Sequence, residues 1–399
     1  MSKVPKLRFK EFSGDWEEKR LNEFSIINPK NSELPNEFIY IDLDSVESGV
    51  LRKSNKISSN DAPSRAQRVM EKGDILYQTV RPYQRNNLYF NLDIEIENYV
   101  SSTGYAQLRT KQNRNFLFQI MHTDKFVNKV LEKCTGTSYP AINSKDLGKL
   151  YIGYPTLPEQ EEISSFLSSV DTKIEKIEKK VELLKQYKKG MMQKIFSQEI
   201  RFKDENGNDY PDWVEKELGE VVEFKKGSSV SKSDINISGE NKCILYGELF
   251  TKYKEIIYSV KSKTNKKLEG IGQKFDILMP TSDVTPNGLA RASCLLENNI
   301  ILSGDMNILR PLKKLNGCYF SYQLNYENKK IMERVSGTTV KHIYVKDIKN
   351  LLYNIPDDLQ EQEKIANILS ALDSKIEILE KELSNSKEFK KGLLQSMFV

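Results

Sequence analysis

Residues 159–196, EQEEISSFLSSVDTKIEKIEKKVELLKQYKKGMMQKIF, recur as residues 361–398, EQEKIANILSALDSKIEILEKELSNSKEFKKGLLQSMF. The register is strict, since Gln160 matches Gln362 at an offset of 202 positions. The segments before the two copies are more weakly similar, and the chain's two tryptophans, Trp16 and Trp213, occupy matched places in them. An internal repeat fixes the architecture before other features are considered. We therefore expect two similar modules, each a globular part followed by one long helix.

Apolar residues in each copy recur at alternating intervals of four and three, which is typical of a coiled-coil seam. A helix of about 38 residues would be about 57 Å long. The lysines Lys188 and Lys390 interrupt both seams at the same place, where a polar residue usually sets register and pairing. The residues that we predict to pair the helices are Ile163, Leu167, Val170, Ile174, Ile177, Val181, Leu184, Gly190, Ile365, Leu369, Leu372, Ile376, Leu379, Leu383 and Gly392.

Helices this long and one-sided need a partner, and two repeats related by a pseudo-dyad would pack their helices antiparallel. Gly190 and Gly392 are then interpreted as points of close approach, because glycine inside a helix otherwise costs about 1 kcal/mol. Pro158 suits a first helical turn, and Asp357 and Asp358 suit an N-terminal cap. The alternative is pairing with helices of another protein.

The fold class that follows is α+β: two mixed α/β domains separated by two long antiparallel coiled-coil helices in a pseudo-two-fold repeat. We expect a first module at 1–155, a first helix at 156–198, a second module at 199–355 and a second helix at 356–399. Residues 75–80, 105–108, 277–279 and 306–309 are predicted strands, listed here in chain order.

Composition limits the class of protein. The chain has 399 residues, which suits two globular domains. It lacks an 18-residue apolar run and an apolar leader, so we expect neither a membrane span nor a signal peptide. Its four scattered cysteines indicate thiols in a reducing cytoplasm and no zinc site. A net charge of +5 is compatible with nucleic acid without proving it.

Polar loops at matched places in the two modules are candidates for DNA contact, although an ordinary polar surface loop is the alternative for each residue. Arginine, glutamine and asparagine can reach base edges. Such side chains, with neighbouring aromatic or hydroxyl groups, are Thr79, Arg81, Tyr83, Gln84, Arg85 and Asn86 in the first module and Ser282, Asp283, Thr285, Asn287 and Arg291 in the second.

A second pair of segments begins with glycine and continues with hydroxyl residues, a combination that suits phosphate contacts. A tight turn leading into the helix is the alternative. The candidates in these segments are Thr137, Ser138, Tyr139, Thr338, Thr339, Lys341 and His342.

Motifs for catalysis are missing from the sequence. We find no phosphate-binding G-x-x-x-x-G-K-[ST] loop and no N-P-P-[YF] segment for methylating a base. His122 and His342 are the only histidines, and neither has a visible catalytic partner. Pro211-Asp212 with Glu223-Phe224-Lys225 fits a loose nuclease spacing, but the other repeat lacks it, so we reject it. The sequence thus predicts no catalytic, cofactor-binding or metal-binding residues.

The whole chain resembles the specificity subunit of type I restriction–modification systems. The closing segments carry this resemblance: Gly136-Thr137-Ser138 and Lys145-Asp146-Leu147 before Glu159-Gln160-Glu161, repeated as Gly337-Thr338-Thr339 and Lys346-Asp347-Ile348 before Glu361-Gln362-Glu363. The helix endings Lys188-Lys189-Gly190 and Lys390-Lys391-Gly392 are similar to that family as well. The second copy departs from the pattern where Asp357-Asp358-Leu359 replaces a Pro-x-x-Pro helix entry.

The resemblance implies two target-recognition domains, each binding one half of a bipartite double-stranded DNA target, with the helices between them as a spacer. It implies no catalysis by this chain. Two methyltransferase subunits would supply S-adenosylmethionine chemistry on adenine, and restriction/translocase subunits would use ATP and Mg. The rival hypothesis is a duplicated, non-catalytic coiled-coil scaffold that binds proteins rather than DNA; a fused methyltransferase or nuclease is disfavoured by the missing motifs.

Overall fold

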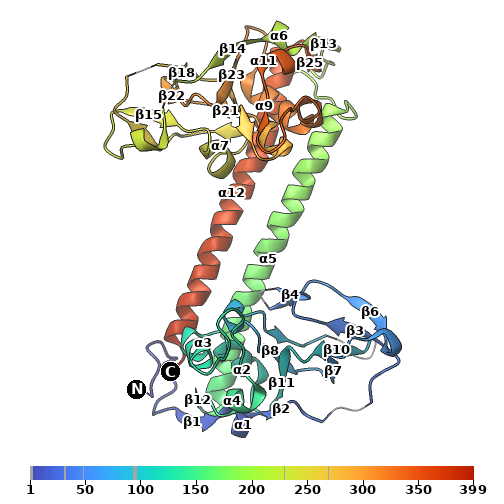
Figure 1. The fold of residues 1–399 in the computed structure, drawn as a ribbon, viewed down its shortest axis with the longest axis vertical. Helices are drawn as coiled ribbons and strands as arrows, with labels where there is room; N and C mark the ends of the chain where they lie inside the picture. The colour runs from blue at the N-terminus through green and yellow to red at the C-terminus, as the bar shows by residue number, and fades with distance from the viewer. Residues whose placement is uncertain (1–2, 31–32, 48, 93–96, 229, 268) are drawn as a thin grey trace. The chain divides into compact units, whose positions relative to one another are not determined.

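The computed structural model describes residues 3–30, 33–47, 49–92, 97–228, 230–267 and 269–399. Two long helices are its largest elements: α5 (Leu157–Phe196) has 40 residues and α12 (Leu359–Ser396) has 38, in green and red in Figure 1. The predicted helices are thereby confirmed. Asp358 caps α12, because its Oδ1 accepts the Gln360 N–H at 2.7 Å. None of the described helices is sufficiently long and apolar to cross a membrane.

The chain divides into two compact units. Unit 1 contains Met1–Lys179 and Lys381–Val399, and unit 2 contains Lys180–Glu380. Each unit therefore combines one globular module with parts of both long helices. The units therefore do not follow the order module, helix, module and helix along the chain. The C-terminal part of α5 belongs with the second module, and the C-terminal part of α12 belongs with the first.

The two helices pair antiparallel within each unit, as predicted. Their residue numbers run in opposite directions along a series of ion pairs: Asp171–Lys390 at 2.5 Å, Lys173–Glu382 at 3.7 Å and Glu178–Lys387 at 2.6 Å in unit 1, with Lys185–Glu380 and Lys188–Asp373, both at 2.6 Å, in unit 2. The seam lysines thus pair with matched aspartates of the opposite helix, which gives the pairing a defined register.

The apolar seam is largely buried, and its first residues belong to a core that the globular module and both helix ends share. Ile163 and Leu167 join the hydrophobic core of unit 1 together with Leu393 of the other helix and Phe398, which follows that helix. The further buried seam residues are Ile174, Ile177, Val181, Ile365, Leu369, Ile376 and Leu379. The partly buried ones are Val170, Leu184, Leu372 and Leu383. The predicted seam therefore serves both helix pairing and domain packing.

The two helix glycines are a correction to the sequence interpretation. A Cβ added to Gly190 or Gly392 would have no described atom within 4 Å, so neither glycine is needed for close approach within the chain. Gly392 is exposed and Gly190 is partly exposed. The mistake arises because the sequence gives the position of a residue along a helix but not the width of the space that it faces.

The first module of unit 1 contains small sheets and short helices. Sheet β2-β11-β8-β9 is antiparallel, and β3 and β10 pair in parallel in sheet β6-β3-β10-β7. Its elements are β1 (Glu17–Arg20), α1 (Leu21–Phe24), β2 (Ile26–Ile27), β3 (Glu37–Ile41), β4 (Val46–Glu47), β5 (Val50–Leu51), β6 (Asn55–Ser58), η1 (Ser59–Asp61), β7 (Ala66–Val69), β8 (Ile75–Gln78), η2 (Pro82–Gln84), β9 (Leu88–Tyr89), β10 (Tyr99–Ser102), β11 (Tyr105–Arg109), α2 (Arg114–Ile120), α3 (Asp124–Leu131), α4 (Ser144–Gly148) and β12 (Tyr151–Tyr154).

The second module, in unit 2, repeats this plan with sheets β14-β23-β19-β21-β16 and β17-β15-β22-β18. Its elements are β13 (Trp213–Glu217), α6 (Leu218–Val221), β14 (Val222–Lys226), η3 (Lys232–Asp234), β15 (Asn241–Ile244), α7 (Glu248–Thr251), β16 (Ile256–Ile257), β17 (Lys263–Thr264), β18 (Ile271–Gly272), β19 (Ile277–Pro280), β20 (Ser282–Asp283), α8 (Pro286–Leu289), β21 (Ser293–Leu295), β22 (Ile300–Leu302), β23 (Met306–Pro311), α9 (Gly317–Tyr326), α10 (Lys329–Met332), β24 (Lys341–His342), α11 (Val345–Ile348) and β25 (Leu352–Pro356). The predicted strands correspond to β8, β11, β19 and β23.

Matched polar anchors attach each module to the start of its following helix. The Trp16 indole N–H donates to Glu159, and the Trp213 indole N–H donates to Glu361, both at 3.2 Å. An arginine also forms an ion pair with each glutamate, Arg8 in unit 1 at 2.8 Å and Arg201 in unit 2 at 2.9 Å. Because these glutamates are buried, the paired donors offset the cost of removing a carboxylate from water.

Candidate nucleic-acid interface

The two predicted segments of the first module meet in space. The Arg81 N–H donates to the Pro140 carbonyl at 2.8 Å, and Val80 forms a β-bridge with Ala141. The Ile142 N–H donates to the Thr79 carbonyl at 3.0 Å. The loop after β8 and the Gly136 segment therefore form one continuous surface, although nearly sixty residues separate them in the sequence.

An arginine and a tyrosine lie in contact on this surface. The Arg81 guanidinium lies 4.6 Å from the centroid of the Tyr139 ring, and Tyr139 is 62% exposed. Arg81 has a φ of 54°, an uncommon conformation for a residue with a side chain. Nearby Tyr83 is half exposed. A guanidinium beside exposed rings offers donors for a base edge and flat faces for stacking.

Other candidates of the first module shape the loop. Thr79 is buried and donates its hydroxyl to the Gly104 carbonyl at 2.7 Å, so the structure directs it away from a ligand. Arg85 donates to the His122 carbonyl at 2.9 Å and pairs with Asp124 at 2.5 Å. Burial lowers the pKa of His122 to about 4, which keeps the imidazole neutral behind the loop at neutral pH.

Gln84 and Asn86 are held by one side chain. Gln78 donates through Nε2 to Gln84 Oε1 at 2.8 Å and accepts the Asn86 N–H on Oε1 at 3.0 Å. Gln84 remains exposed and Asn86 partly exposed. Gln78 thus fixes the loop that presents them, a role that the sequence prediction missed because Gln78 was assigned to the preceding strand.

The corresponding segments also meet in the second module. Strand β20 pairs antiparallel with β24, so that Ser282 faces His342 and Asp283 faces Lys341. The Ile343 N–H donates to the Thr281 carbonyl at 3.1 Å, which repeats the bond between Ile142 and Thr79. The same backbone frame therefore brings different side chains together in the two modules.

A stacked aromatic pair lies on this second surface, with His342 partly exposed and Tyr344 exposed. The His342 and Tyr344 rings stack with centroids 6.1 Å apart and an interplanar angle of 16°. Tyr344 is half exposed and was missed by the sequence analysis. The available signal was its spacing, since residues two apart on an extended segment project to the same face. Lys341 donates to the Gly337 carbonyl at 2.6 Å and stabilises the adjacent turn.

The remaining second-module candidates organise the loop after β20. The Thr285 hydroxyl donates to Asp283 at 2.7 Å and accepts the Gly288 N–H at 3.2 Å, which caps α8. Arg291 donates to the carbonyls of Phe250 and Tyr253 at 3.3 and 3.0 Å, so its guanidinium ties the loop before β21 to the C-terminal end of α7. Asn287 is exposed and lines a polar cleft of about 240 Å³ with Arg291.

The glycine segments are tight turns that present hydroxyl groups. Gly136 and Gly337 have φ values of 89° and 104°, and a Cβ at Gly337 would lie 2.2 Å from the Val340 carbonyl oxygen. Backbone bonds close both turns, between Thr135 and Ala141 and between Ser336 and His342. The exposed hydroxyl residues that the turns present are Thr137, Ser138, Thr338 and Thr339. Both segments are therefore tight turns, a geometry compatible with phosphate contact.

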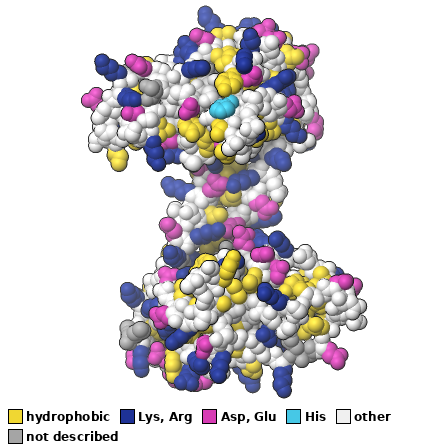
Figure 2. Space-filling model, viewed as in Figure 1, with side chains coloured by type: hydrophobic (Ala, Val, Ile, Leu, Met, Phe, Trp, Pro, Cys, Tyr) yellow, Lys and Arg dark blue, Asp and Glu magenta, His cyan; other side chains and the backbone are white. Residues whose placement is uncertain are grey.

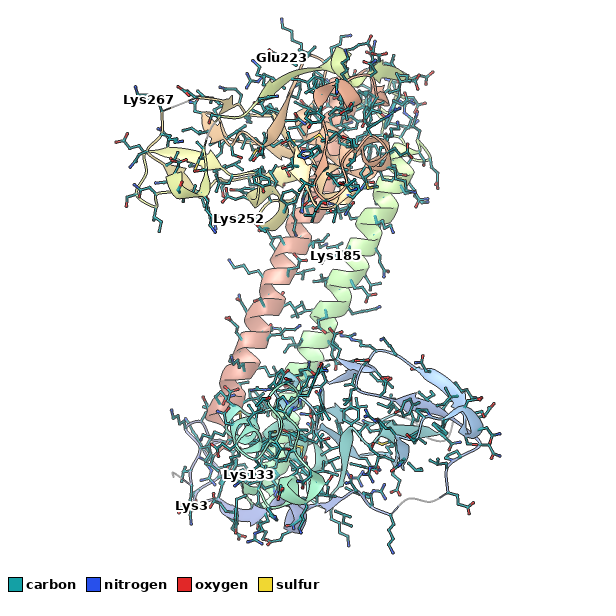
Figure 3. All side chains as sticks on the ribbon, viewed as in Figure 1. Lys3, Lys133, Lys185, Glu223, Lys252 and Lys267 are labelled. Carbon is teal, nitrogen blue, oxygen red and sulfur yellow. The ribbon has the colours of Figure 1, made fainter. Side chains whose placement is uncertain are left out.

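Charge is distributed over the surface. Figure 2 shows Lys and Arg side chains interspersed with Asp and Glu on the visible face of each globular part. In the lysine run of the second module, Lys266 pairs with Asp234 at 3.0 Å, while Lys267 is exposed and projects outward (Figure 3). Across the described residues, no group of three or more His, Cys, Asp or Glu side chains is arranged to hold a metal ion. Local loop geometry thus distinguishes these surfaces more than charge does.

Comparisons with known proteins agree with this duplicated plan. The family described as "Type I restriction modification DNA specificity domain" matches residues 13–186 and again residues 210–386. The chain is 29% identical to a putative type I restriction enzyme MjaX specificity subunit of Methanocaldococcus jannaschii, over 81% of this chain and 76% of that protein. It is 25% identical to the MjaVIII specificity subunit of the same organism, over 97% and 94%.

A solved structure shares the fold. The type I restriction–modification S subunit from M. genitalium superposes with a TM-score of 0.65 at 17% identity, over 99% of both chains. The two matches of the family cover most of the sequence, one in each module. The chain therefore belongs to the type I restriction–modification DNA specificity family, and it is a specificity subunit with two DNA specificity domains.

Proposed function

We propose that each module binds one half of a bipartite double-stranded DNA target. The observation that carries this proposal is the repeated meeting of two loops: Val80 with Ala141 in one module and β20 with β24 in the other. The shared backbone frame supports a common mode of docking. The different side chains on it support recognition of different half-sequences, because base edges are distinguished by the donors and acceptors that face them.

Specific roles follow from exposure together with the ring contacts of Arg81 and His342. Arg81, Tyr83 and Tyr139 are the proposed base-contacting group of the first module, and His342 and Tyr344 are that of the second. The exposed hydroxyl residues of the two glycine turns would contact phosphates, which position a protein on DNA without reading its sequence. Thr79, Arg85 and Arg291 would act by holding the loops.

This chain, in the same proposal, performs no methyl transfer or cleavage itself. Two methyltransferase subunits would bind S-adenosylmethionine and modify adenine, and restriction/translocase subunits would bind ATP and Mg, all in the cytoplasm. The helices would carry the methyltransferase subunits at matched places. Tyr187 on α5 and Phe389 on α12 support this, since they are equivalent in the repeat and each is more than half exposed.

The test is the methylome of a host without its own restriction–modification systems that expresses this chain with its neighbouring methyltransferase subunit. We expect a new split motif with one methylated adenine in each half, on opposite strands. Arg81→Ala should alter only one half of the motif, and His342→Ala only the other. Lys267→Ala, which changes an exposed lysine outside both loops, is the matched control and should leave the motif unchanged.

Two outcomes would overturn the proposal. A soluble complex that methylates no new motif would favour the protein-binding scaffold instead. Methyl transfer to DNA by the purified chain with S-adenosylmethionine alone would make this chain the enzyme.

A further inference from the structure

Two thiols are in contact inside the second module. Cys294 lies on β21 and Cys318 is the second residue of α9, and their sulfur atoms are 3.5 Å apart. Both cysteines are free; Cys294 is fully buried and Cys318 is partly exposed. One member of the pair is therefore partly exposed to solvent, while the other is buried.

A glycine makes this proximity possible. A Cβ on Gly317, at the start of α9, would lie 3.2 Å from the Cys294 sulfur and 2.1 Å from the Phe275 carbonyl oxygen. The absence of a side chain lets the first turn of α9 pack directly on β21. A disulfide requires a sulfur separation of about 2.05 Å, so the two atoms need to approach by only about 1.5 Å.

The two sulfur atoms differ in reactivity. The hydrogen bond from the Cys294 thiol, together with the charge of Lys274, holds the pKa of Cys318 below its usual value. Burial raises the pKa of Cys294. The thiolate is the nucleophilic form of cysteine, and a position in the first turn of a helix also favours it. Cys318 is therefore suited to react first and Cys294 to react second.

We propose that Cys294 and Cys318 form a redox modification site that hydrogen peroxide converts to a disulfide. The Cys318 thiolate attacks one peroxide oxygen; an S–O bond forms, the O–O bond breaks, and the leaving hydroxide takes up a proton to become water. The Cys294 sulfur then attacks the Cys318 sulfenic acid. The S–S bond forms, the S–O bond breaks, and the departing hydroxide leaves as water with the Cys294 proton.

The location of the site confines its effect to the second module. Strand β21 follows the loop that contains Arg291, and Asn325 of α9 fixes the end of that loop through two hydrogen bonds with Ala292, at 3.2 and 2.6 Å. A disulfide would add a covalent link between the same strand and helix. The oxidised protein should therefore resist unfolding of the second module more strongly, with no corresponding change in the first.

The experiment uses the full chain as purified under reducing conditions. It is exposed to hydrogen peroxide, its remaining thiols are alkylated, and it is digested without reduction for mass spectrometry. We expect a cross-linked peptide pair containing Cys294 and Cys318 that disappears on reduction. Cys243→Ser, which removes a buried cysteine outside the pair, is the matched control and should give the same cross-link.

A second measurement separates the two chemical steps. In Cys294→Ser the sulfenic acid on Cys318 has no resolving thiol, so trapping by dimedone at Cys318 should increase several-fold over the wild-type chain. The proposal is overturned if peroxide oxidises Cys318 of the wild-type chain to sulfinic acid without a cross-link. It is also overturned if Cys134 or Cys243 reacts before Cys318, or if the cross-link forms only after the protein is unfolded.

Discussion

Replacing Lys188 by methionine should strongly destabilise unit 2. The Lys188 ammonium lies 2.6 Å from Asp373 of α12 and 2.9 Å from Glu255 of the second module. The side chains are only 11%, 16% and 23% exposed for Lys188, Asp373 and Glu255, respectively. Methionine keeps most of the length of the side chain but removes the ammonium that pairs with both carboxylates, leaving Asp373 with the Tyr322 hydroxyl at 2.6 Å. Removal of one partner from a buried ion pair typically costs about 3–5 kcal/mol, and we expect a loss in that range at pH 7.5.

The loss should decrease on acidification. In the wild-type chain, burial and the neighbouring Glu255 raise the pKa of Asp373. Burial opposes ionisation of Glu255 too, but the charge of Lys188 holds the pKa of Glu255 below its usual value. Without Lys188, both folded-state pKa values rise. A carboxyl group whose pKa is higher in the folded state than in the unfolded state contributes stability at low pH and loses it as the pH rises through the folded value.

The free energy difference between variant and wild type should therefore shrink from pH 8 toward pH 5, at up to about 1.4 kcal/mol per pH unit for each proton taken up. Urea unfolding is the assay, followed by Trp213 fluorescence in a Trp16→Phe background, because Trp213 belongs to the core of unit 2. The matched control is Lys390→Met, whose ion pair lies in unit 1; its unfolding is followed by Trp16 fluorescence in a Trp213→Phe background, since Trp16 belongs to the core of unit 1.

The control removes the equivalent lysine from a more exposed pair. Lys390 and Asp171 are 23% and 28% exposed, and a single partly solvated pair of this kind should contribute about 1 kcal/mol. Equal losses for the two variants, or a loss for Lys188→Met that does not depend on pH, would refute the reasoning.

Three other changes test the spacer, the glycines and the base-contacting loop. Inserting one helical turn after Lys185, matched by a turn after Glu380, adds about 6 Å of helix. The stretch of DNA between the two recognised half-sequences should then lengthen by about two base pairs, as seen in the methylated motif. An unchanged stretch would show that the helices do not set the distance between the half-sequences. Alanine at Gly190 and Gly392 should raise the free energy of unfolding by about 0.5–1 kcal/mol at each position, measured by denaturant titration, and a loss would reveal a close contact there. Arg81→Gly relieves a positive φ and should preserve stability while weakening target binding roughly tenfold, measured by fluorescence anisotropy with the methyltransferase complex; unchanged affinity would exclude a base contact.

The long helices and central strands were predictable because their signals are local. The alternation of apolar residues between Ile163 and Leu184 is a property of one segment, and its repetition in the chain supplies the partner. Aliphatic and aromatic runs such as residues 75–78 likewise indicate strands before any tertiary contact is known.

The candidate interface was predictable only in part. The sequence identified both loop segments of each module, but the pairing of Ser282 with His342 depends on how the chain folds between them. Nor does a sequence show whether a polar side chain faces solvent. Arg81 and Arg85 are four residues apart in one loop, yet the first lies beside an exposed tyrosine ring and the second is bonded to a carbonyl and a carboxylate.

The ion network around Lys188 ties the second module to both long helices within unit 2. Glu255 belongs to the second module, whereas Lys188 belongs to the helix that precedes it. Asp373 also accepts from the Tyr322 hydroxyl of α9 at 2.6 Å, and the equivalent aspartate of the other repeat, Asp171, accepts from the Gln119 amide of α2 at 2.9 Å. A transplanted module would therefore bring an amide to a helix aspartate that meets a tyrosine hydroxyl in this chain, or the reverse. Exchange of half-sequences between such chains should succeed only when the residue that meets the seam lysine or aspartate is exchanged to match.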